Sequence, residues 1–220
     1  MKFDLRRRAL IGAQKDVFPA WFQRCEYIKN PSAGRSWINT GVVPNDETGI
    51  LYDFEITGNL ANAVDIPFIG CRENSRSTRF FFGKYLSSST SSMYMGFNDV
   101  LLMGIPQQTN VRLQGYLNYK NSRIAKYSNS NEIAISSSLY QPRTETIYIN
   151  NMNNAGQVLG NDVMGGLRTF YAEITQGTQI IHKYFPGYNT ESGVIGLYDT
   201  CQKEFLTNSG SSDFIKGADI

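Results

Sequence analysis

The chain has 220 residues, including 13 Phe, 13 Tyr and 20 Gly, and only 18% of its residues are charged. This length suits one all-β domain with a sizeable core, and the aromatic and glycine content favours strands and tight turns over amphipathic helices. The 21 basic and 19 acidic side chains give a formal net charge of +2, which is too small to indicate a nucleic-acid-binding protein.

The first 22 residues are expected to form a short N-terminal arm. Its basic run, Arg6, Arg7 and Arg8, suits either an acidic partner surface, nucleic acid or plain solvation. The apolar stretch 9–13 is too short for the core of a secretory signal. No apolar run approaches the roughly 20 residues of a membrane crossing. We therefore expect no export signal and no membrane partner.

From residue 23 onward the pattern predicts strands in one domain that extends to residue 220. The clearest strand is at 49–57, where the alternation is nearly strict and Ile50, Tyr52, Phe54 and Ile56 should share one face. Three later segments end in an aromatic or apolar residue and Gly, which suggests antiparallel neighbours. The predicted strands are 25–29, 36–43, 49–57, 67–70, 80–83, 94–96, 110–117, 123–126, 133–136, 146–150, 167–174, 179–184, 194–198 and 204–207.

The last two predicted strands form a hairpin, because Asp199 can accept a hydrogen bond from the backbone two residues on. After the hairpin, Phe214 and Ile215 are expected to fix the end of the chain to the body of the domain. Trp37, Phe54, Phe81, Leu197 and Phe205 are expected to be largely buried. No sustained helical period is present.

The three cysteines, Cys25, Cys71 and Cys201, are widely spaced. An odd number at such spacing indicates neither a disulfide framework nor a metal site. Buried free thiols are the simpler interpretation. A Cys25–Cys201 disulfide between the first and last strands is the alternative.

Acid–base catalysis would require paired carboxylates, and Asp53 and Glu55 are the comparable pair because their spacing places them on one strand face. Glycoside hydrolases of the glucanase type place several acidic side chains along one strand, and here Ile56 and Thr57 follow instead of a third acidic residue. We interpret the two side chains as a polar, solvent-facing edge instead. His182 is the sole histidine, without a nearby nucleophile motif, and we expect a surface or hydrogen-bonded role for it. No phosphate loop or dinucleotide motif is present. We expect no catalytic, cofactor-binding or metal-binding residue.

Two kinds of ligand site are left open by the sequence. Calcium would need several oxygen ligands from loops, which Asn45-Asp46-Glu47, Asn98-Asp99 and Asn161-Asp162 could supply, although these residues are also good turn formers. Sugar rings could stack on exposed aromatic side chains, although core packing explains most Tyr in a β-rich chain. The aromatic candidates are Trp37, Tyr85, Tyr94, Tyr116, Tyr119 and Tyr127.

Several motifs occur in one order: Glu26-Tyr-Ile with Trp37-Ile-Asn-Thr-Gly and Pro44-Asn, Ile69-Gly-Cys-Arg, Thr146-Ile-Tyr-Ile-Asn-Asn, Phe170-Tyr-Ala-Glu-Ile-Thr-Gln-Gly-Thr, Phe185-Pro-Gly, and Gly196-Leu-Tyr-Asp with Glu204-Phe-Leu-Thr-Asn-Ser-Gly. In this order the chain resembles the concanavalin A-like, laminin-G-like jelly rolls of gut bacterial and phage surface proteins, over about residues 25–217. The resemblance implies two curved antiparallel sheets packed face to face. It does not fix a function, since this scaffold serves lectins, hydrolases and structural modules.

A surface-display fold without an export signal predicts a non-enzymatic phage virion protein, made in the host cytoplasm and released by assembly and lysis. It would be a capsid-decorating, head-fibre or tail-associated protein with a lectin-like jelly roll. Its arm would dock to other virion proteins, and host or mucosal glycans and further copies of the chain are the other partners considered. The alternative is a free carbohydrate-binding module of a gut bacterium. The ligand-binding residues are not identified by the sequence.

Overall fold

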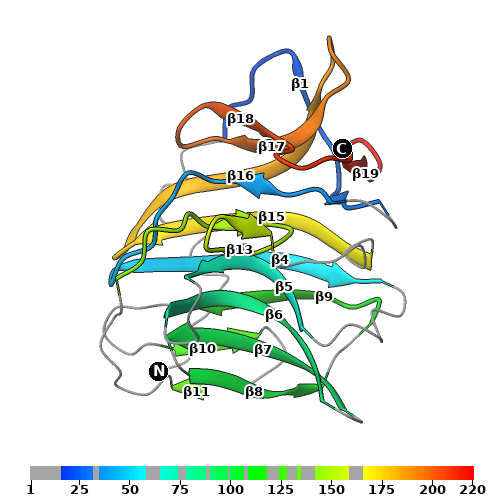
Figure 1. The fold of residues 1–220 in the computed structure, drawn as a ribbon. Helices are drawn as coiled ribbons and strands as arrows, with labels where there is room; N and C mark the ends of the chain where they lie inside the picture. Colours follow the sequence, from blue (N-terminus) through cyan, green and yellow to red (C-terminus); the bar gives the residue numbers. More distant parts are fainter. Residues whose placement is uncertain are drawn as a thin grey trace.

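The computed structural model describes residues 16–31, 35–57, 65–73, 78–87, 90–98, 100–106, 109–117, 124–127, 133–134, 142–158 and 166–220. These residues form two β-sheets, one of them curled into a half-barrel (Figure 1). The strand pairs are antiparallel apart from the parallel pair of β13 and β5 within the described part of the chain. The fold is therefore all-β, as the composition and the alternation predict.

The larger sheet has 11 strands and follows the order β11-β10-β9-β4-β15-β16-β17-β18, with β1, β2 and β19 attached at its side. Its strands are β1 (Phe22–Arg24), β2 (Ile28–Lys29), β4 (Thr48–Ile56), β9 (Arg112–Leu117), β10 (Ile124–Tyr127), β11 (Ile133–Ala134), β15 (Leu167–Gln176), β16 (Gln179–Asn189), β17 (Ile195–Asp199), β18 (Glu204–Thr207) and β19 (Ile215–Lys216).

The smaller sheet has eight strands in the order β14-β13-β5-β6-β7-β8. β12 pairs with β5, and β3 pairs with β12. Its strands are β3 (Ile38–Asn39), β5 (Asp65–Arg72), β6 (Arg79–Ser87), β7 (Thr90–Asn98), β8 (Val100–Pro106), β12 (Tyr148–Ile149), β13 (Asn153–Asn154) and β14 (Gln157–Val158). Among the described residues, no helix has the length and hydropathy that a membrane crossing requires.

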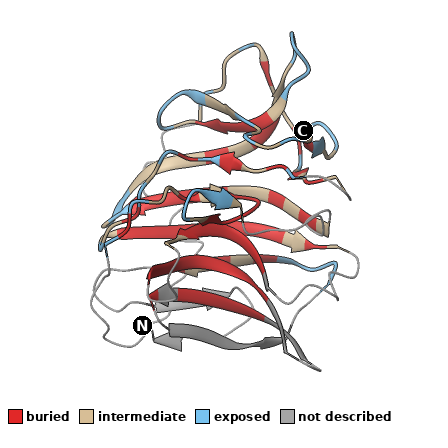
Figure 2. Cartoon of the chain, viewed as in Figure 1, coloured by how far each residue is buried: buried red, intermediate tan, exposed pale blue. Residues whose placement is uncertain are grey.

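The core lies between the two sheets, and β4 supplies its central row. Ile50, Tyr52, Phe54 and Ile56 are all fully buried, which confirms the predicted one-sided alternation. Opposite them, the inward face of β5, β6 and β7 supplies further apolar side chains, among them Phe68 and Phe82. Figure 2 shows the buried residues concentrated along these central strands.

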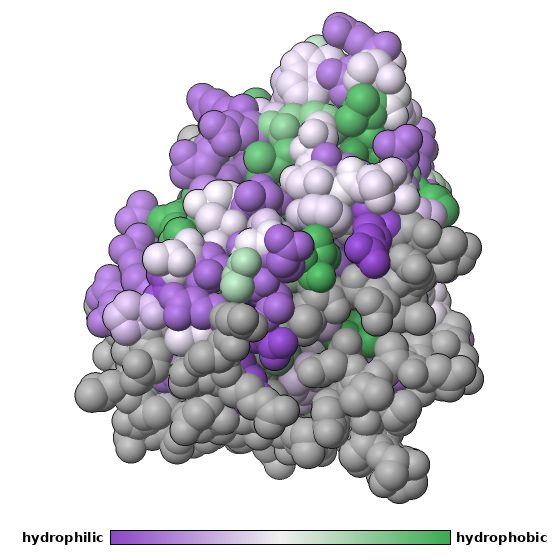
Figure 3. All heavy atoms as spheres, viewed as in Figure 1, coloured by the Kyte–Doolittle hydropathy of each residue, from purple (hydrophilic) through white to green (hydrophobic). Residues whose placement is uncertain are grey.

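The larger sheet extends beyond the smaller one at the end formed by β17 and β18 (Figure 1). In the space-filling view, apolar residues gather over this upper part of the molecule (Figure 3). The chain after β18 turns back here, where Ser209 N and Ser211 N donate to the carbonyls of Trp37 and Arg35. This returning segment places buried Phe214 against the core, as expected, whereas Ile215 is exposed and contributes through the pairing of β19 with β2.

The predicted C-terminal hairpin is confirmed, because β17 pairs with β18 from Gly196 to Asp199. Asp199 Oδ1 accepts a hydrogen bond from Cys201 N at 2.9 Å, as the turn chemistry predicts. The three glycine-terminated segments are neighbours in β5, β6 and β7. Their glycines lie inside the strands rather than at the ends. A side chain at Gly83 or Gly96 would collide with the neighbouring strand, which explains the need for glycine at these positions.

Some sequence predictions differ from the structure. The strand predicted at 36–43 is reduced to β3, and β1, β8, β13, β14 and β19 were not predicted. Trp37 and Phe205 are only half-buried, because they lie toward the ends of the sandwich, whereas Phe54, Phe81 and Leu197 are buried. The predicted domain boundary at residue 23 falls inside β1.

The described end of the predicted arm, residues 16–22, packs on β16 and β18. The ring of Phe18 lies 5.3 Å from that of Phe185 in β16, and the ring of Trp21 lies 5.7 Å from that of Phe205 in β18. These contacts attach residues 16–22 to the sandwich. Residues 1–15, with Arg6, Arg7 and Arg8, lie outside the described residues.

We expect Leu197→Ala to lower the free energy of unfolding by about 2–5 kcal/mol, because the side chain is fully buried in the core and its removal leaves a cavity. Val194→Ala is the matched control, since Val194 is 43% exposed and its truncation should change stability by less than about 0.5 kcal/mol. Urea unfolding followed by tryptophan fluorescence measures both. Equal stability of the Leu197 variant and the wild type would contradict the inward orientation of β17.

Candidate functional site

A groove of about 510 Å³ crosses the outer face of the larger sheet. It lies where β9, β4 and β15 meet the segment that joins β1 to β2. Three guanidinium groups, two carboxylates and two aromatic rings line it, so the groove combines charge with flat apolar surface. Its lining residues are Arg24, Glu26, Tyr27, Glu55, Arg112, Arg168, Phe170 and Ile220.

A β-bulge in β15 places two consecutive aromatic residues on this outer face. The pairing with β4 shifts between Thr169 and Tyr171, so Phe170 is the extra residue. Thr169 and Ala172 both point into the core and are fully buried, whereas Phe170 and Tyr171 are half-exposed. Bulges often re-aim side chains next to functional sites, and this one turns Phe170 toward the groove.

Asp53 is tied into a polar network at the groove. Arg112 donates two hydrogen bonds to its carboxylate, at 2.7 and 2.8 Å. Gln114 Nε2 donates a third at 3.1 Å. The hydrogen bond with Asp53 raises the pKa of Arg112 above its ordinary value. A two-pronged guanidinium–carboxylate pair of this kind fixes both side chains in position.

A second guanidinium–carboxylate pair lies two residues further along β4, on the same face of the sheet. Arg168 Nη1 donates to Glu55 Oε1 at 3.1 Å, and Glu55 is the register partner of both Arg112 and Arg168 across the three strands. Arg112 also lies 4.2 Å from the centre of the Phe170 ring. Cation–π contacts like this one hold a guanidinium flat against an aromatic face.

This arrangement corrects the interpretation of Asp53 and Glu55 as a solvent-facing strand edge. β4 is a central strand between β9 and β15, and Asp53 is only 4% exposed. Both carboxylates accept hydrogen bonds from guanidinium groups, which hold them in place on the outer face of the sheet.

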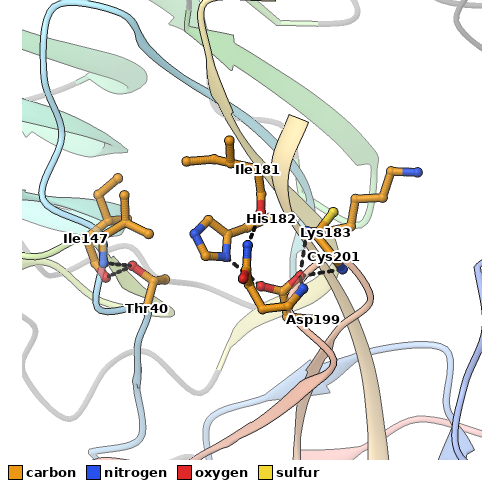
Figure 4. Close-up of polar contacts among 9 residues, drawn as sticks. Thr40, Ile147, Ile181, His182, Lys183, Asp199 and Cys201 are labelled. Atoms are coloured by element: carbon orange, nitrogen blue, oxygen red, sulfur yellow. Dashed lines mark hydrogen bonds and ion pairs between the residues drawn. The ribbon is translucent and has the colours of Figure 1, made fainter. Parts of the chain in front are cut away.

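His182 lies on the other face of the sheet and is hydrogen-bonded, as expected. Its Nδ1 lies 2.5 Å from Asp199 Oδ2, and its ring stacks parallel to Tyr184. Figure 4 shows the ring between Asp199 and Thr40. The Thr40 hydroxyl donates to the carbonyl of Ile147 at 2.8 Å, so its proton is already engaged. The contacts with Asp199 and Tyr184 account for the position of His182 through structure alone.

Cys201 lies beside the same aspartate but is poorly suited to act as a nucleophile. Partial burial and the negative charge of Asp199 raise the pKa of its thiol, and the thiolate is the reactive form. All three cysteines are free; Cys25 and Cys71 are buried, whereas Cys201 is exposed. The predicted free thiols are confirmed, the alternative Cys25–Cys201 disulfide is absent, and the expected burial is wrong for Cys201.

The loop residues considered for calcium act as turn formers where the structure describes them. Asn45 Oδ1 accepts hydrogen bonds from Glu47 N at 2.9 Å and from Thr48 Oγ1 at 3.2 Å. Asn98 Oδ1 accepts one from Arg143. Asp99, Asn161 and Asp162 lie outside the described residues. No cluster of three or more His, Cys, Asp or Glu suited to a metal ion occurs among the residues described.

The aromatic residues chosen for sugar stacking are not those that line the groove. Tyr94 is buried against Phe81, and Trp37 stacks on Tyr148. Tyr116 is half-buried in β9, and Tyr119 lies outside the described residues. Tyr85 and Tyr127 belong to β6 and β10. The residues that sequence reasoning missed are Arg24, Tyr27, Arg112, Arg168 and Phe170, and the broken alternation at 169–172 was the signal for the last of them.

Comparisons with known proteins leave the chain without an assigned relative. No protein-family model matches it, and no curated protein matches it.

In the folded protein we expect one thiol per chain, that of Cys201, to react with Ellman's reagent at pH 8. Burial raises the pKa of Cys25 to about 11 and that of Cys71 to about 12, so both remain protonated and shielded. The reaction should accelerate as the pH rises, disappear in Cys201→Ser, and extend to three thiols after denaturation. Fewer than three thiols in the denatured, unreduced protein would instead indicate a disulfide.

Proposed function

We propose that this chain is a non-enzymatic virion structural protein whose β-sandwich displays the outer-face groove as a glycan-binding site. The observation that carries the binding part is the lattice of Asp53, Arg112, Glu55 and Arg168, with Tyr27 and Phe170 beside it. Planar polar groups with fixed positions suit pairs of sugar hydroxyls. A guanidinium group lies over the ring of Phe170 and another over that of Tyr27, so the two rings would contact a sugar through their remaining surface. Asp53 and Glu55 are both engaged with guanidinium groups, which supports binding without hydrolysis.

We further propose that the sandwich is a concanavalin A-like jelly roll. In support, the sequence motifs behind that resemblance fall on β3, β5, β12, the β15–β16 hairpin and the β17–β18 hairpin. These elements are the centre and one end of the two sheets. An experimental structure with a strand order different from that of a jelly roll would contradict this assignment.

The virion part of the proposal rests on the N-terminal arm. Residues 16–22 are fixed to the sandwich by Phe18 and Trp21, and we propose residues 1–15 as the segment that attaches to a particle. A free carbohydrate-binding module would have the same groove but would need no such segment. The two functions are therefore distinguished by particle incorporation and not by glycan binding.

Deletion of residues 1–15 should leave a folded, monodisperse protein, because the contacts of Phe18 and Trp21 remain. If the arm docks to a virion, the truncated protein should be missing from purified particles, as measured by mass spectrometry of the particles. Arg6→Ala, Arg7→Ala and Arg8→Ala together should weaken incorporation in a salt-dependent way if the partner surface is acidic. Incorporation of the truncated protein at the wild-type level would exclude the arm as the attachment element.

We expect the wild type to release no reducing sugar from any polysaccharide that it binds. Asp53→Asn, Glu55→Gln and His182→Ala should therefore cause no change in hydrolysis. Asp53→Asn should still weaken binding, because it loosens Arg112. Reducing-sugar release measured beside affinity electrophoresis separates these effects. Hydrolysis by the wild type that disappears in the Asp53 or Glu55 variant would show an enzyme instead.

A further inference from the structure

Arg24, at the end of β1, carries a charge that the described protein does not neutralise by a direct contact. Its guanidinium carbon lies 4.9 Å from the centre of the Phe185 ring and 5.5 Å from that of Phe18. The guanidinium group forms no hydrogen bond or ion pair with the described residues, and its buried Nε has no acceptor there. The side chain is therefore held by two aromatic faces while its hydrogen-bonding edge stays available to the groove.

Arg168 has a second donor of the same kind on the opposite side of the groove. Its Nη1 is bonded to Glu55, and its guanidinium lies 4.6 Å from the centre of the Tyr27 ring. Its Nε is buried and also lacks an acceptor in the described protein. Buried donors nearly always have a partner, so these two Nε atoms are unusual. Because both are shielded from solvent, a ligand in the groove would be bound by the other guanidinium nitrogens of Arg24 and Arg168.

One of the three guanidinium groups of the groove has no carboxylate partner among the described residues. Asp53 and Glu55 are already paired with Arg112 and Arg168. Glu26 is the other carboxylate of the lining, and it is exposed at the rim. Arg24 is thus the guanidinium without a carboxylate partner. Guanidinium groups match the geometry of carboxylates through two parallel hydrogen bonds.

We propose that the groove binds the carboxylate of an acidic sugar, a uronic acid in a polyuronide, with Arg24 as the main contact and Arg168 as its second donor. This inference rests on the glycan-binding function proposed above and names its ligand class. Tyr27 and Phe170 then border the ring that carries the carboxylate. Sulfated glycans offer a related anion, but their tetrahedral groups match a planar guanidinium pair less closely than a carboxylate does.

The first test uses the full-length wild-type chain and does not depend on a variant that folds. Binding to immobilised polygalacturonate is measured with galacturonate and galactose as competitors, a pair that differs only in the carboxylate. We expect galacturonate to compete at a concentration at least tenfold lower. Equal competition would overturn the carboxylate proposal while leaving glycan binding intact, whereas no binding to any glycan in an array would contradict the proposed function itself.

The second test removes the charge at Arg24. Arg24→Gln should weaken polygalacturonate binding at least tenfold, and Arg24→Lys should restore only part of it because lysine keeps the charge but not the planar fork. Lys203→Gln is the matched control, since it removes the same charge from the exposed β17–β18 turn. Circular dichroism checks that each variant is folded.

Two outcomes of the second test would overturn the proposal. One is an equal loss of affinity in the Lys203 and Arg24 variants, which would indicate attraction by overall charge alone. The other is binding of dextran sulfate as tight as that of polygalacturonate, which would indicate a general polyanion surface. Retention of wild-type affinity by Arg24→Gln would exclude Arg24 from the site.

Discussion

A buried polar network joins the two sheets, and the rest of the sandwich depends on its geometry. Tyr52 of β4 and Thr169 of β15 share a hydrogen bond of 2.5 Å, and both reach Asn150, which follows β12 of the smaller sheet. Asn150 Nδ2 then donates to Asn30 Oδ1 at 3.1 Å. All four side chains are buried. Buried polar groups are costly without partners. A shift of either sheet by one residue would leave these four side chains buried without their hydrogen-bond partners.

The same two strands connect that network to the groove. Tyr52 points inward while its neighbour Asp53 points outward, so the register that satisfies the Tyr52 hydroxyl also fixes the Asp53 carboxylate opposite Gln114 of β9. In β15 the bulge after Thr169 keeps the core side of the strand filled while adding Phe170 to the outer face. The groove is thus positioned by constraints that act in the core, which is why its polar side chains can be fixed before any ligand binds.

The sequence predicted the features that local physics decides. Alternation at 50–56 identified β4 because one face of that strand is buried, and the turn-forming side chain of Asp199 identified the last hairpin. It did not predict the site, because the groove depends on which strands become neighbours: Arg112, Glu55 and Arg168 are far apart in the sequence and meet only through the order β9-β4-β15. Arg24 was hidden for the same reason, since its aromatic partners Phe18 and Phe185 come from both ends of the chain.

In the proposed glycan site, the guanidinium–carboxylate pairs would serve recognition. Asp53 is held by three hydrogen bonds from Arg112 and Gln114. Such rigidity lowers the conformational entropy that binding would otherwise cost. Arg24 differs from Arg112 and Arg168. The rings of Phe18 and Phe185 fix its position, and its guanidinium group makes no hydrogen bond with the described residues. In the proposed site, Arg24 would select the charge of the ligand, and the paired residues around it would select the ligand's shape.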